Sequence, residues 1–229
     1  MRYGLQKLTL LDFPGITACT VFTCGCNFRC PFCHNPGLVS GGKDSLEFSL
    51  PEILSFLEKR RGVLDGICIT GGEPLLHDES IQLAKSAKEI GYKVKIDTNG
   101  SYPEKLQQII DECCVDYVAM DIKNSPEKYE AATSFSGIEK IRESVLLLLQ
   151  GKVDYEFRTT VTGNLHTADD FEKIGKWIAG AKRYFLQKFR NSENLLTDDG
   201  SVFEVEAELL SEYQKIVREF VMNVQIRGI

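Results

Sequence analysis

Two hydrophobic patterns alternate along the chain. Short runs rich in β-branched and aromatic residues are typical of buried strands, and longer stretches with an apolar residue every three or four positions are typical of helices that bury one face. The short runs predict strands at residues 17–22, 66–70, 93–97, 117–122, 155–161 and 183–187. The longer stretches predict helices at residues 50–61, 79–90, 103–113, 138–149, 168–179 and 207–220. This order of elements is typical of βα units with parallel strands.

The connections between these elements limit the possible folds. Because β-α-β crossovers are right-handed, six consecutive βα units would curl into an α/β barrel or form an open doubly wound sheet. The 229 residues suffice for one sizeable core, so we expect a single domain over residues 1–229. A polar stretch at residues 190–201 predicts a surface loop late in the chain.

Composition narrows the class of protein. With 43% hydrophobic and 26% charged residues, the chain resembles soluble globular proteins rather than disordered ones. The longest apolar run, at residues 145–149, is too short to cross a bilayer, and the first residues lack the unbroken apolar stretch of a secretory signal. We therefore expect a cytoplasmic protein with no membrane partner. The net charge of −6 argues against a nucleic-acid partner.

Four short motifs come at the ends of the first four predicted strands. The first strand is followed by CGCNFRCPFCHNP at residues 24–36, the second by GGEP at 71–74, and the third by DTNG at 97–100. The fourth strand ends in MDIK at 120–123. Because the carboxyl ends of parallel strands meet at one edge of a sheet, we expect these motifs to lie close together. That edge is where α/β proteins build their active sites.

The cysteine-rich segment is the strongest chemical signal. Cys26, Cys30 and Cys33 have the spacing C-x3-C-x2-C. A reducing compartment keeps thiols free, which favours metal binding over disulfide formation. Zinc would need a fourth ligand, which Cys24 or His34 could supply. An iron–sulfur cluster usually binds four thiolates, so a cluster held by three has one iron open to a substrate.

Together these motifs resemble a known family. The cysteine spacing, with Phe32 before the last cysteine, resembles the signature of the radical S-adenosylmethionine (SAM) enzymes. GGEP, DTNG and MDIK resemble, in order and spacing, the branch that activates glycyl radical enzymes. Residues 10–36 look most like the anaerobic ribonucleoside-triphosphate reductase activating proteins. The resemblance covers most of the chain and implies an α/β fold, a partial (βα)6 barrel with parallel strands.

The resemblance also implies which residues bind the cofactors. Cys26, Cys30 and Cys33 would hold a 4Fe-4S cluster and would be both the catalytic and the metal-binding residues. SAM would contact the other predicted site residues, which are Phe32, Gly71, Gly72, Glu73, Asp97, Thr98, Asn99, Asp121, Lys123 and Arg158. Glu73 would accept a hydrogen bond from the methionyl ammonium group. A monovalent cation beside the SAM carboxylate would be bound by Asp97, Thr98, Met120 and Asp121.

Several of these residues have a simpler interpretation when each is taken alone. GGEP could form an ordinary βα loop and DTNG a turn. Asp121 and Lys123 could form an ion pair at the barrel rim, and Arg158 could lie on the surface. Four further cysteines are expected to be small buried hydrophobic residues, namely Cys19, Cys68, Cys113 and Cys114. Three histidines are expected to be solvated or locally hydrogen-bonded, namely His34, His77 and His166.

The reaction that the resemblance implies is the activation of a partner protein. One electron from a single reduced cluster would cleave SAM, and the resulting 5′-deoxyadenosyl radical would remove a Cα hydrogen from a glycine of the partner. The expected partner is anaerobic ribonucleoside-triphosphate reductase. A flavodoxin or ferredoxin would supply the electron. Three alternatives stay open: a pyruvate formate-lyase-type partner, a small-molecule substrate as for 7-carboxy-7-deazaguanine synthase, and a zinc-stabilised interaction domain without catalysis.

Overall fold

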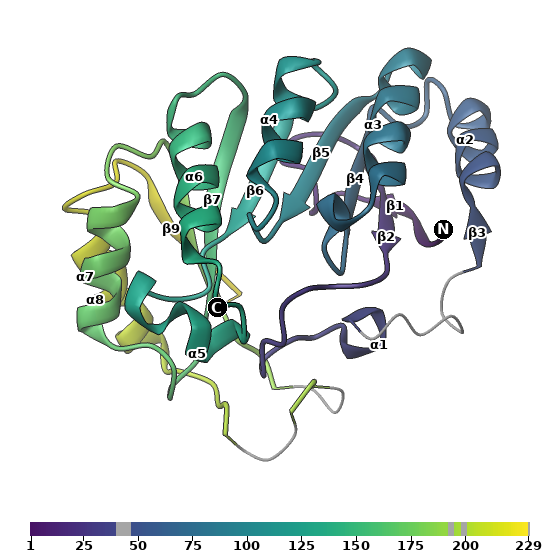
Figure 1. Ribbon diagram of the computed structural model, residues 1–229. Coiled ribbons are helices and arrows are strands. Elements are labelled where there is room, and N and C mark those ends of the chain that lie inside the picture. The colour runs from purple at the N-terminus through teal and green to yellow at the C-terminus, as the bar shows by residue number, and fades with distance from the viewer. Residues whose placement is uncertain (40–46, 192–194, 198–200, 229) are drawn as a thin grey trace.

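The computed structural model describes residues 1–39, 47–191, 195–197 and 201–228. These residues contain a nine-stranded sheet with the order β3-β1-β2-β4-β5-β6-β7-β8-β9. The strands are β1 (Arg2–Thr9), β2 (Ala18–Thr23), β3 (Phe48–Ser49), β4 (Gly66–Gly71), β5 (Lys93–Thr98), β6 (Tyr117–Asp121), β7 (Asp154–Val161), β8 (Tyr184–Lys188) and β9 (Val224–Arg227). Within the described chain β3 and β9 are the edges, so the barrel is partial (Figure 1).

Seven strands of the sheet are parallel, from β2 through β4 to β9. β1 runs antiparallel to both β2 and β3. The carboxyl ends of the parallel strands therefore share one edge, which lies at the bottom of Figure 1 with α1 and α5. The strand register sets pairs of residues side by side at this edge, such as Asp121 on β6 and Arg158 on β7.

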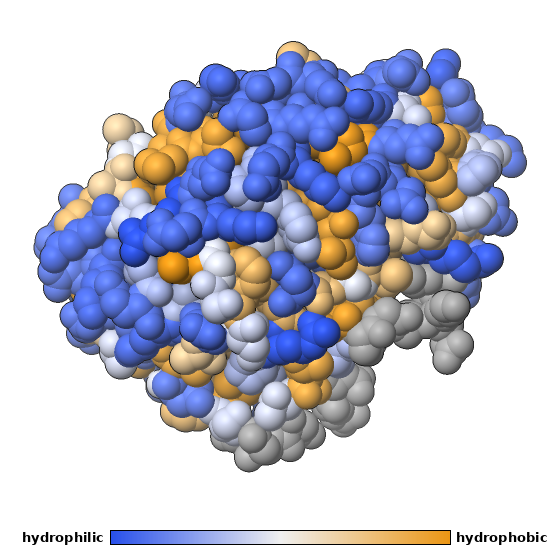
Figure 2. Space-filling model, in the orientation of Figure 1, coloured by the Kyte–Doolittle hydropathy of each residue, from blue (hydrophilic) through white to orange (hydrophobic). Residues whose placement is uncertain are grey.

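The larger helices cover one face of the sheet (Figure 1). The helices are α1 (Pro36–Val39), α2 (Leu50–Lys59), α3 (Asp78–Ile90), α4 (Pro103–Asp111), α5 (Tyr129–Thr133), α6 (Ile138–Leu149), α7 (Ala168–Trp177) and α8 (Ala207–Val217), with short 3-10 turns η2 (Pro74–Leu76) and η3 (Pro126–Lys128). Local signals fix several ends: Ser49 and Glu52 form a capping box at α2, and Gly91 ends α3 in the left-handed conformation. The outer face of the helix layer is mostly hydrophilic, with smaller hydrophobic areas between (Figure 2).

The six predicted strands and six predicted helices are all confirmed, with small differences at their ends. The α/β class with a mostly parallel sheet is also confirmed, but the number of parallel strands is corrected from six to seven. β9 is only four residues long, so its sequence carries little periodicity. β1 and β3 add an antiparallel edge that the prediction lacked. At 190–201, the described residues are in neither helix nor strand, and the others lie outside the described chain.

The expected burial of the extra cysteines is right at three positions and wrong at one. Cys19, Cys68 and Cys114 are buried. Cys113 is exposed, because α4 ends at Asp111 and leaves this residue in a left-handed turn. No helix in the described part of the chain has the length and hydropathy needed to span a membrane.

Asp170 joins α7 to the segment that follows β6. Its carboxylate is fully buried and accepts hydrogen bonds from the hydroxyls of Ser125 and Thr167, at 2.8 and 2.7 Å. It also pairs with the ammonium group of Lys128 at 2.7 Å. Burial would raise the pKa of Asp170, but these hydrogen bonds lower it below its usual value. The carboxylate thus fixes the chain just beyond the MDIK motif.

We expect Asp170→Ala to lower the free energy of unfolding by about 2–4 kcal/mol, because it leaves buried donors without an acceptor. The exposed neighbour Asp169 is the control, and Asp169→Ala should change stability by less than about 0.5 kcal/mol. Since the pKa of Asp170 is lowered on folding, its contribution should persist above about pH 4 and decline as the pH falls further. Urea denaturation at several pH values measures both effects. Equal stabilities of the two variants would contradict this assignment.

Candidate active site

One cavity lies at the carboxyl edge of the parallel strands. Its volume is about 200 Å³, and its walls come from the cysteine loop and the ends of β4, β5, β6 and β7. It brings together all of the residues predicted to form the site except Glu73 and Met120. Five further residues line the cavity and were not predicted to do so, namely Phe28, Asn35, Val39, Thr70 and Thr160. Thr160 could have been found from the strand pattern, because it lies two residues from Arg158 and so faces the same side.

Contacts from distant parts of the chain hold the cysteine loop in place. Near its start, the backbone N–H of Gly25 donates to the carbonyl of Leu38 at 2.7 Å. In its middle, the N–H of Arg29 donates to the carbonyl of Thr133 in α5 at 2.7 Å. At its far side, His34 stacks on the ring of Phe189 and bonds the carbonyl of Arg190 at 2.8 Å. The loop therefore spans from β2 to the end of β8.

The three histidines are locally hydrogen-bonded, as expected. His34 has the carbonyl of Arg190 as its partner. His77 bonds the carbonyl of Cys24 at 2.8 Å, and His166 bonds the carbonyl of Lys123 at 3.0 Å. They support the loops around the cavity through backbone contacts.

Cys26, Cys30 and Cys33 all line the cavity, whereas Cys24 does not. Burial raises the pKa of the Cys30 thiol to about 12 and also raises the pKa of Cys26, and the other thiols of the loop contribute to both shifts. In the ranges described, no three His, Cys, Asp or Glu side chains lie close enough to hold one metal ion. The three thiols are thus near one another without forming a compact site for a single ion such as zinc. They would have to lose protons when a metal group binds.

The two glycines of GGEP are required by a close approach of two backbone segments. A Cβ atom on Gly72 would lie 2.0 Å from the carbonyl oxygen of Gly25. A Cβ atom on Gly71, whose φ is +120°, would lie 2.3 Å from the carbonyl oxygen of Thr23. Because the glycines have no Cβ, the two segments are close enough to form hydrogen bonds. The N–H of Gly72 donates to the carbonyl of Thr23 at 2.9 Å, and the N–H of Glu73 donates to the carbonyl of Gly25 at 2.8 Å. The glycines therefore dock the second loop onto the start of the cysteine loop.

Glu73 connects the GGEP and DTNG motifs. It is fully buried, and its carboxylate accepts hydrogen bonds from the Thr98 hydroxyl at 2.7 Å and from the N–H groups of Asn99 and Leu75 at 2.6 and 3.0 Å. Burial raises the pKa of Glu73 to about 7, although these three donors act in the opposite direction. Because the carboxylate is turned toward the protein and not into the cavity, its expected contact with a methionyl ammonium group stays a prediction.

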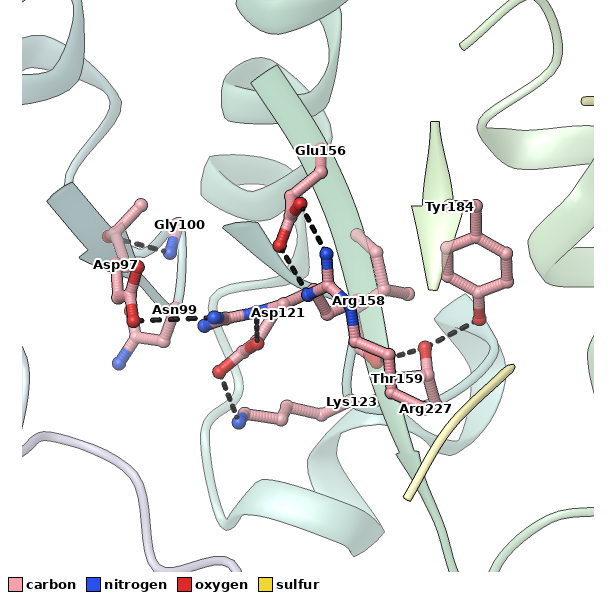
Figure 3. Close-up of polar contacts among 12 residues, drawn as sticks. Asp97, Asn99, Gly100, Asp121, Lys123, Glu156, Arg158, Thr159, Tyr184 and Arg227 are labelled. Atoms are coloured by element: carbon pink, nitrogen blue, oxygen red, sulfur yellow. Dashed lines mark hydrogen bonds and ion pairs between the residues drawn. The ribbon is translucent and has the colours of Figure 1, made fainter. Parts of the chain in front are cut away.

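Charged side chains from β5, β6 and β7 form a connected network beside the cavity (Figure 3). Arg158 lies between two carboxylates, with Nε 2.9 Å from Asp121 and a terminal nitrogen 3.3 Å from Asp97. Lys123 pairs with the second oxygen of Asp121 at 2.9 Å, and Lys95 pairs with Asp97. Arg158 is largely buried, so its interpretation as a surface arginine was wrong. Lys95, which the sequence analysis did not single out, is almost completely buried.

An amide network links the DTNG motif to the cysteine loop. The Asn99 side-chain amide donates to the Asn27 carbonyl oxygen at 3.0 Å and approaches the sulfur of Cys26 at 3.9 Å. Asn27 in turn donates to the hydroxyl of Ser101 at 2.9 Å. The backbone N–H of Phe28 also donates to Cys26, at 3.4 Å. The hydrogen bond from Phe28 favours the thiolate of Cys26, although burial still leaves the pKa of this thiol raised.

We expect Gly72→Ala to destabilise the protein by about 3 kcal/mol or more, because its methyl group would overlap the carbonyl of Gly25. Gly37 in α1 is the control, since a Cβ there meets no atom within 4 Å. Thermal and urea unfolding of both variants measure the difference. A Gly72→Ala protein as stable as Gly37→Ala would show that the two loops are not docked as described.

The raised pKa of Glu73 predicts a particular pH dependence. Between about pH 4.5 and 7 the folded protein would bind more protons at this carboxyl than the unfolded chain, so its contribution to stability should fall as the pH rises through that window. Glu73→Gln should remove this part of the pH dependence, and it should destabilise the protein at low pH because its amide cannot accept all three hydrogen bonds. Glu104→Gln, at an exposed position, is the control. Identical stability–pH curves for wild type and Glu73→Gln would contradict the raised pKa.

Comparison with known proteins relates this geometry to a family. The model of the radical SAM superfamily matches residues 20–178. A candidate glycyl-radical enzyme activating enzyme of Methanocaldococcus jannaschii is 32% identical over 232 residues, which cover 99% of this chain and 95% of that protein. A pyruvate formate-lyase-activating enzyme of Clostridium pasteurianum is 35% identical over 129 residues, which are about half of each chain (53% and 52%).

The fold is also shared with solved structures. The SuiB protein of Streptococcus suis bound to S-adenosylmethionine superposes with a TM-score of 0.68 at 12% identity, over 90% of this chain and 49% of that one. The likeness at this level of identity concerns the fold, and it agrees with the partial barrel described above. The match of the family model across most of the parallel strands and the near full-length relative lead to one conclusion: the chain belongs to the radical SAM superfamily, in the branch of glycyl-radical enzyme activating enzymes.

Proposed function

We propose that this protein binds a 4Fe-4S cluster through Cys26, Cys30 and Cys33 and uses SAM to generate a glycyl radical on anaerobic ribonucleoside-triphosphate reductase. The observation that carries the proposal is the single cavity in which the three cysteines meet the ends of four neighbouring parallel strands. A structural metal site would not need this open cavity beside its ligands. The partner is assigned from the resemblance of residues 10–36 to activating proteins of that reductase.

The residues present fit an iron–sulfur group better than a single ion. The three thiols line one wall of the cavity, and their loop is anchored on both sides. Among the described residues, no three His, Cys, Asp or Glu side chains form a group that could hold a single metal ion. Each iron of a cluster takes its own thiolate, and three ligands leave a fourth iron open. When bound, the cluster would supply the electron that cleaves the sulfonium bond of SAM and so yields the radical that abstracts the glycine hydrogen.

The protein's own side chains would bind and orient SAM. Lys123 and Arg158 place positive charge in the cavity, where the SAM carboxylate could be neutralised. Lys123 also lies 5.9 Å from the centre of the Phe32 ring, so the aromatic residue of the cysteine motif holds the lysine near the ligands. Gly71 and Gly72 line the cavity with backbone alone, which leaves room beside the cluster. Exclusion of water then protects the radical.

Two partners complete the proposal. The glycine-bearing loop of the partner enzyme would enter at the open edge of the barrel and would itself cover the cavity. No second cysteine motif of the ferredoxin type follows Cys33 before GGEP, so a separate flavodoxin or ferredoxin would deliver the electron. We place both encounters in the cytoplasm, whose reducing conditions keep the thiols free.

The test of the function is a direct search for the product radical. Anaerobically reconstituted and reduced protein is incubated with SAM and the anaerobic ribonucleoside-triphosphate reductase of the same genome, and we expect a glycyl doublet in the electron paramagnetic resonance spectrum. A doublet on a different glycyl radical enzyme would overturn the choice of partner. Turnover of a small molecule, with no radical on any such partner, would overturn the activating function.

Substitution of the cysteines tests the ligand set. Cys26→Ala, Cys30→Ala and Cys33→Ala should each abolish binding of four irons and reductive cleavage of SAM, because a cubane with two thiolates is not retained. Cys24→Ala is the matched control and should keep both properties. Iron analysis and chromatographic detection of 5′-deoxyadenosine measure the outcome. Retention of the cluster in one of the three variants, with its loss in Cys24→Ala, would move the ligand set to Cys24.

A further inference from the structure

The monovalent cation expected beside the SAM carboxylate does not fit the residues that were to bind it. All four oxygens of its two carboxylates already have a cationic partner. For Asp121, Arg158 takes one oxygen and Lys123 the other, each at 2.9 Å. For Asp97, Lys95 pairs with one oxygen and Arg158 lies 3.3 Å from the other.

The remaining side-chain ligand of the expected cation site is also occupied. The hydroxyl of Thr98 donates to Glu73 at 2.7 Å and accepts from the N–H of Gly100 at 3.1 Å. Among the described residues, the buried side-chain polar atoms without a hydrogen-bond partner are the hydroxyls of Tyr3 and Ser80 and the Nε of Arg142, which forms an ion pair with Glu139 at 3.4 Å. None of these lines the cavity, so this part of the chain leaves no orphaned acceptor there that would point to a missing cation.

The charges of the network are unfavourable for a further cation. Two carboxylates face three cationic side chains, so the group carries an excess of one positive charge. The guanidinium of Arg158 remains charged at every accessible pH, and it presents donors to two carboxylates at once. Burial alone would raise the pKa of Asp121, but Arg158 and Lys123 lower it to about 2. A metal cation would have to compete with these side chains for the same carboxylate oxygens.

We propose that the guanidinium of Arg158 replaces the metal cation, so that SAM binds to this protein without any requirement for potassium or sodium. The inference rests on the proposed function, because it concerns the SAM site. Figure 3 shows the geometry that carries it: Arg158 reaches from β7 across the end of β6 to β5 and links Asp121 to Asp97. Arg158 is thus a positioning residue that contacts both carboxylates.

The first experiment measures ion binding and SAM binding on the reconstituted wild-type protein. SAM affinity is determined by equilibrium dialysis in potassium, sodium and tetramethylammonium chloride at equal ionic strength, and we expect values within about two-fold of one another. Thallium-205 NMR, with and without SAM, should show no thallium bound to the protein in competition with potassium. Saturable binding of one thallium ion, or a loss of SAM affinity of about ten-fold without potassium, would overturn the inference.

The second experiment asks whether removal of the guanidinium creates a cation requirement. Arg158→Gln should bind SAM at least about ten-fold more weakly in tetramethylammonium, and potassium should restore part of this loss because one oxygen of Asp121 and one oxygen of Asp97 are left without a cationic partner. Arg158→Lys should lose less SAM affinity than Arg158→Gln, and potassium should not change its affinity for SAM. Arg142→Gln, on the exterior helix α6, is the control for loss of an arginine. A folded Arg158→Gln protein with wild-type affinity in all salts would overturn the role of Arg158.

The outcomes separate this inference from the proposed function. Thallium NMR reports on the cation site whether or not a radical forms on any partner. If SAM binds independently of cations but no glycyl radical appears, the function fails and the inference stands. If the radical forms only with potassium present, the function stands and the inference fails. The thermal unfolding temperature and iron content of Arg158→Gln, compared with Arg142→Gln, identify a variant that has lost its fold.

Discussion

The close contact between two backbone segments is the constraint on which the site depends. Where β2 and β4 end, the carbonyls of Thr23 and Gly25 lie directly against the GGEP turn and accept its N–H groups. Any side chain at the glycines of that turn would separate the segments. The position of the cysteine loop relative to the sheet therefore depends on Gly71 and Gly72 having no side chain. Hydrogen bonds to Glu73 then connect the GGEP turn to the DTNG motif, so the three loops form one connected unit.

A second feature of the interior is that buried charges are closely paired. Arg158 contacts two carboxylates at the cavity, and Arg227 on β9 pairs with both oxygens of the buried Glu156 at 2.8 and 2.9 Å. Removing such charges from water is costly, and close pairing offsets this cost without guaranteeing a net gain in stability. The benefit is geometric, because each pair has only one arrangement in which all oxygens are satisfied. The ends of β5, β6 and β7 are thereby held in a fixed relation to the cavity.

The sequence predicted those features of the fold that depend on residues close together in the chain. Apolar runs located the six strands, and glycine and proline located turns and helix ends, because these residues restrict the backbone directly. The topology of parallel strands then brought the motifs to one edge without any knowledge of distances. β9 was missed because it is a four-residue strand whose sheet partner lies about forty residues earlier in the chain. The position of β9 in the sheet depends on its pairing with β8 and not on a hydrophobic pattern within β9 itself.

Other features of the site could not be predicted because they depend on partners far away in the sequence. In the sequence, Lys95 looks like an ordinary polar residue. Only the fold brings its side chain into the interior beside Asp97. Asn27 and Ser101 are 74 residues apart and meet through a single hydrogen bond. Glu73 was recognised as important, but the direction of its carboxylate follows from three donors that no local pattern reveals. The motifs could be predicted from the sequence, whereas the contacts between their side chains depend on the tertiary structure.

The docking of His34 against Phe189 and Arg190 has a consequence for biosynthesis. The cysteines are made early, but the residues that His34 contacts follow β8, more than 150 residues later in the chain. During translation the thiols would be exposed until β8 leaves the ribosome and joins the sheet. The cysteine loop therefore reaches its enclosed arrangement only when a segment made much later in the chain has joined the sheet.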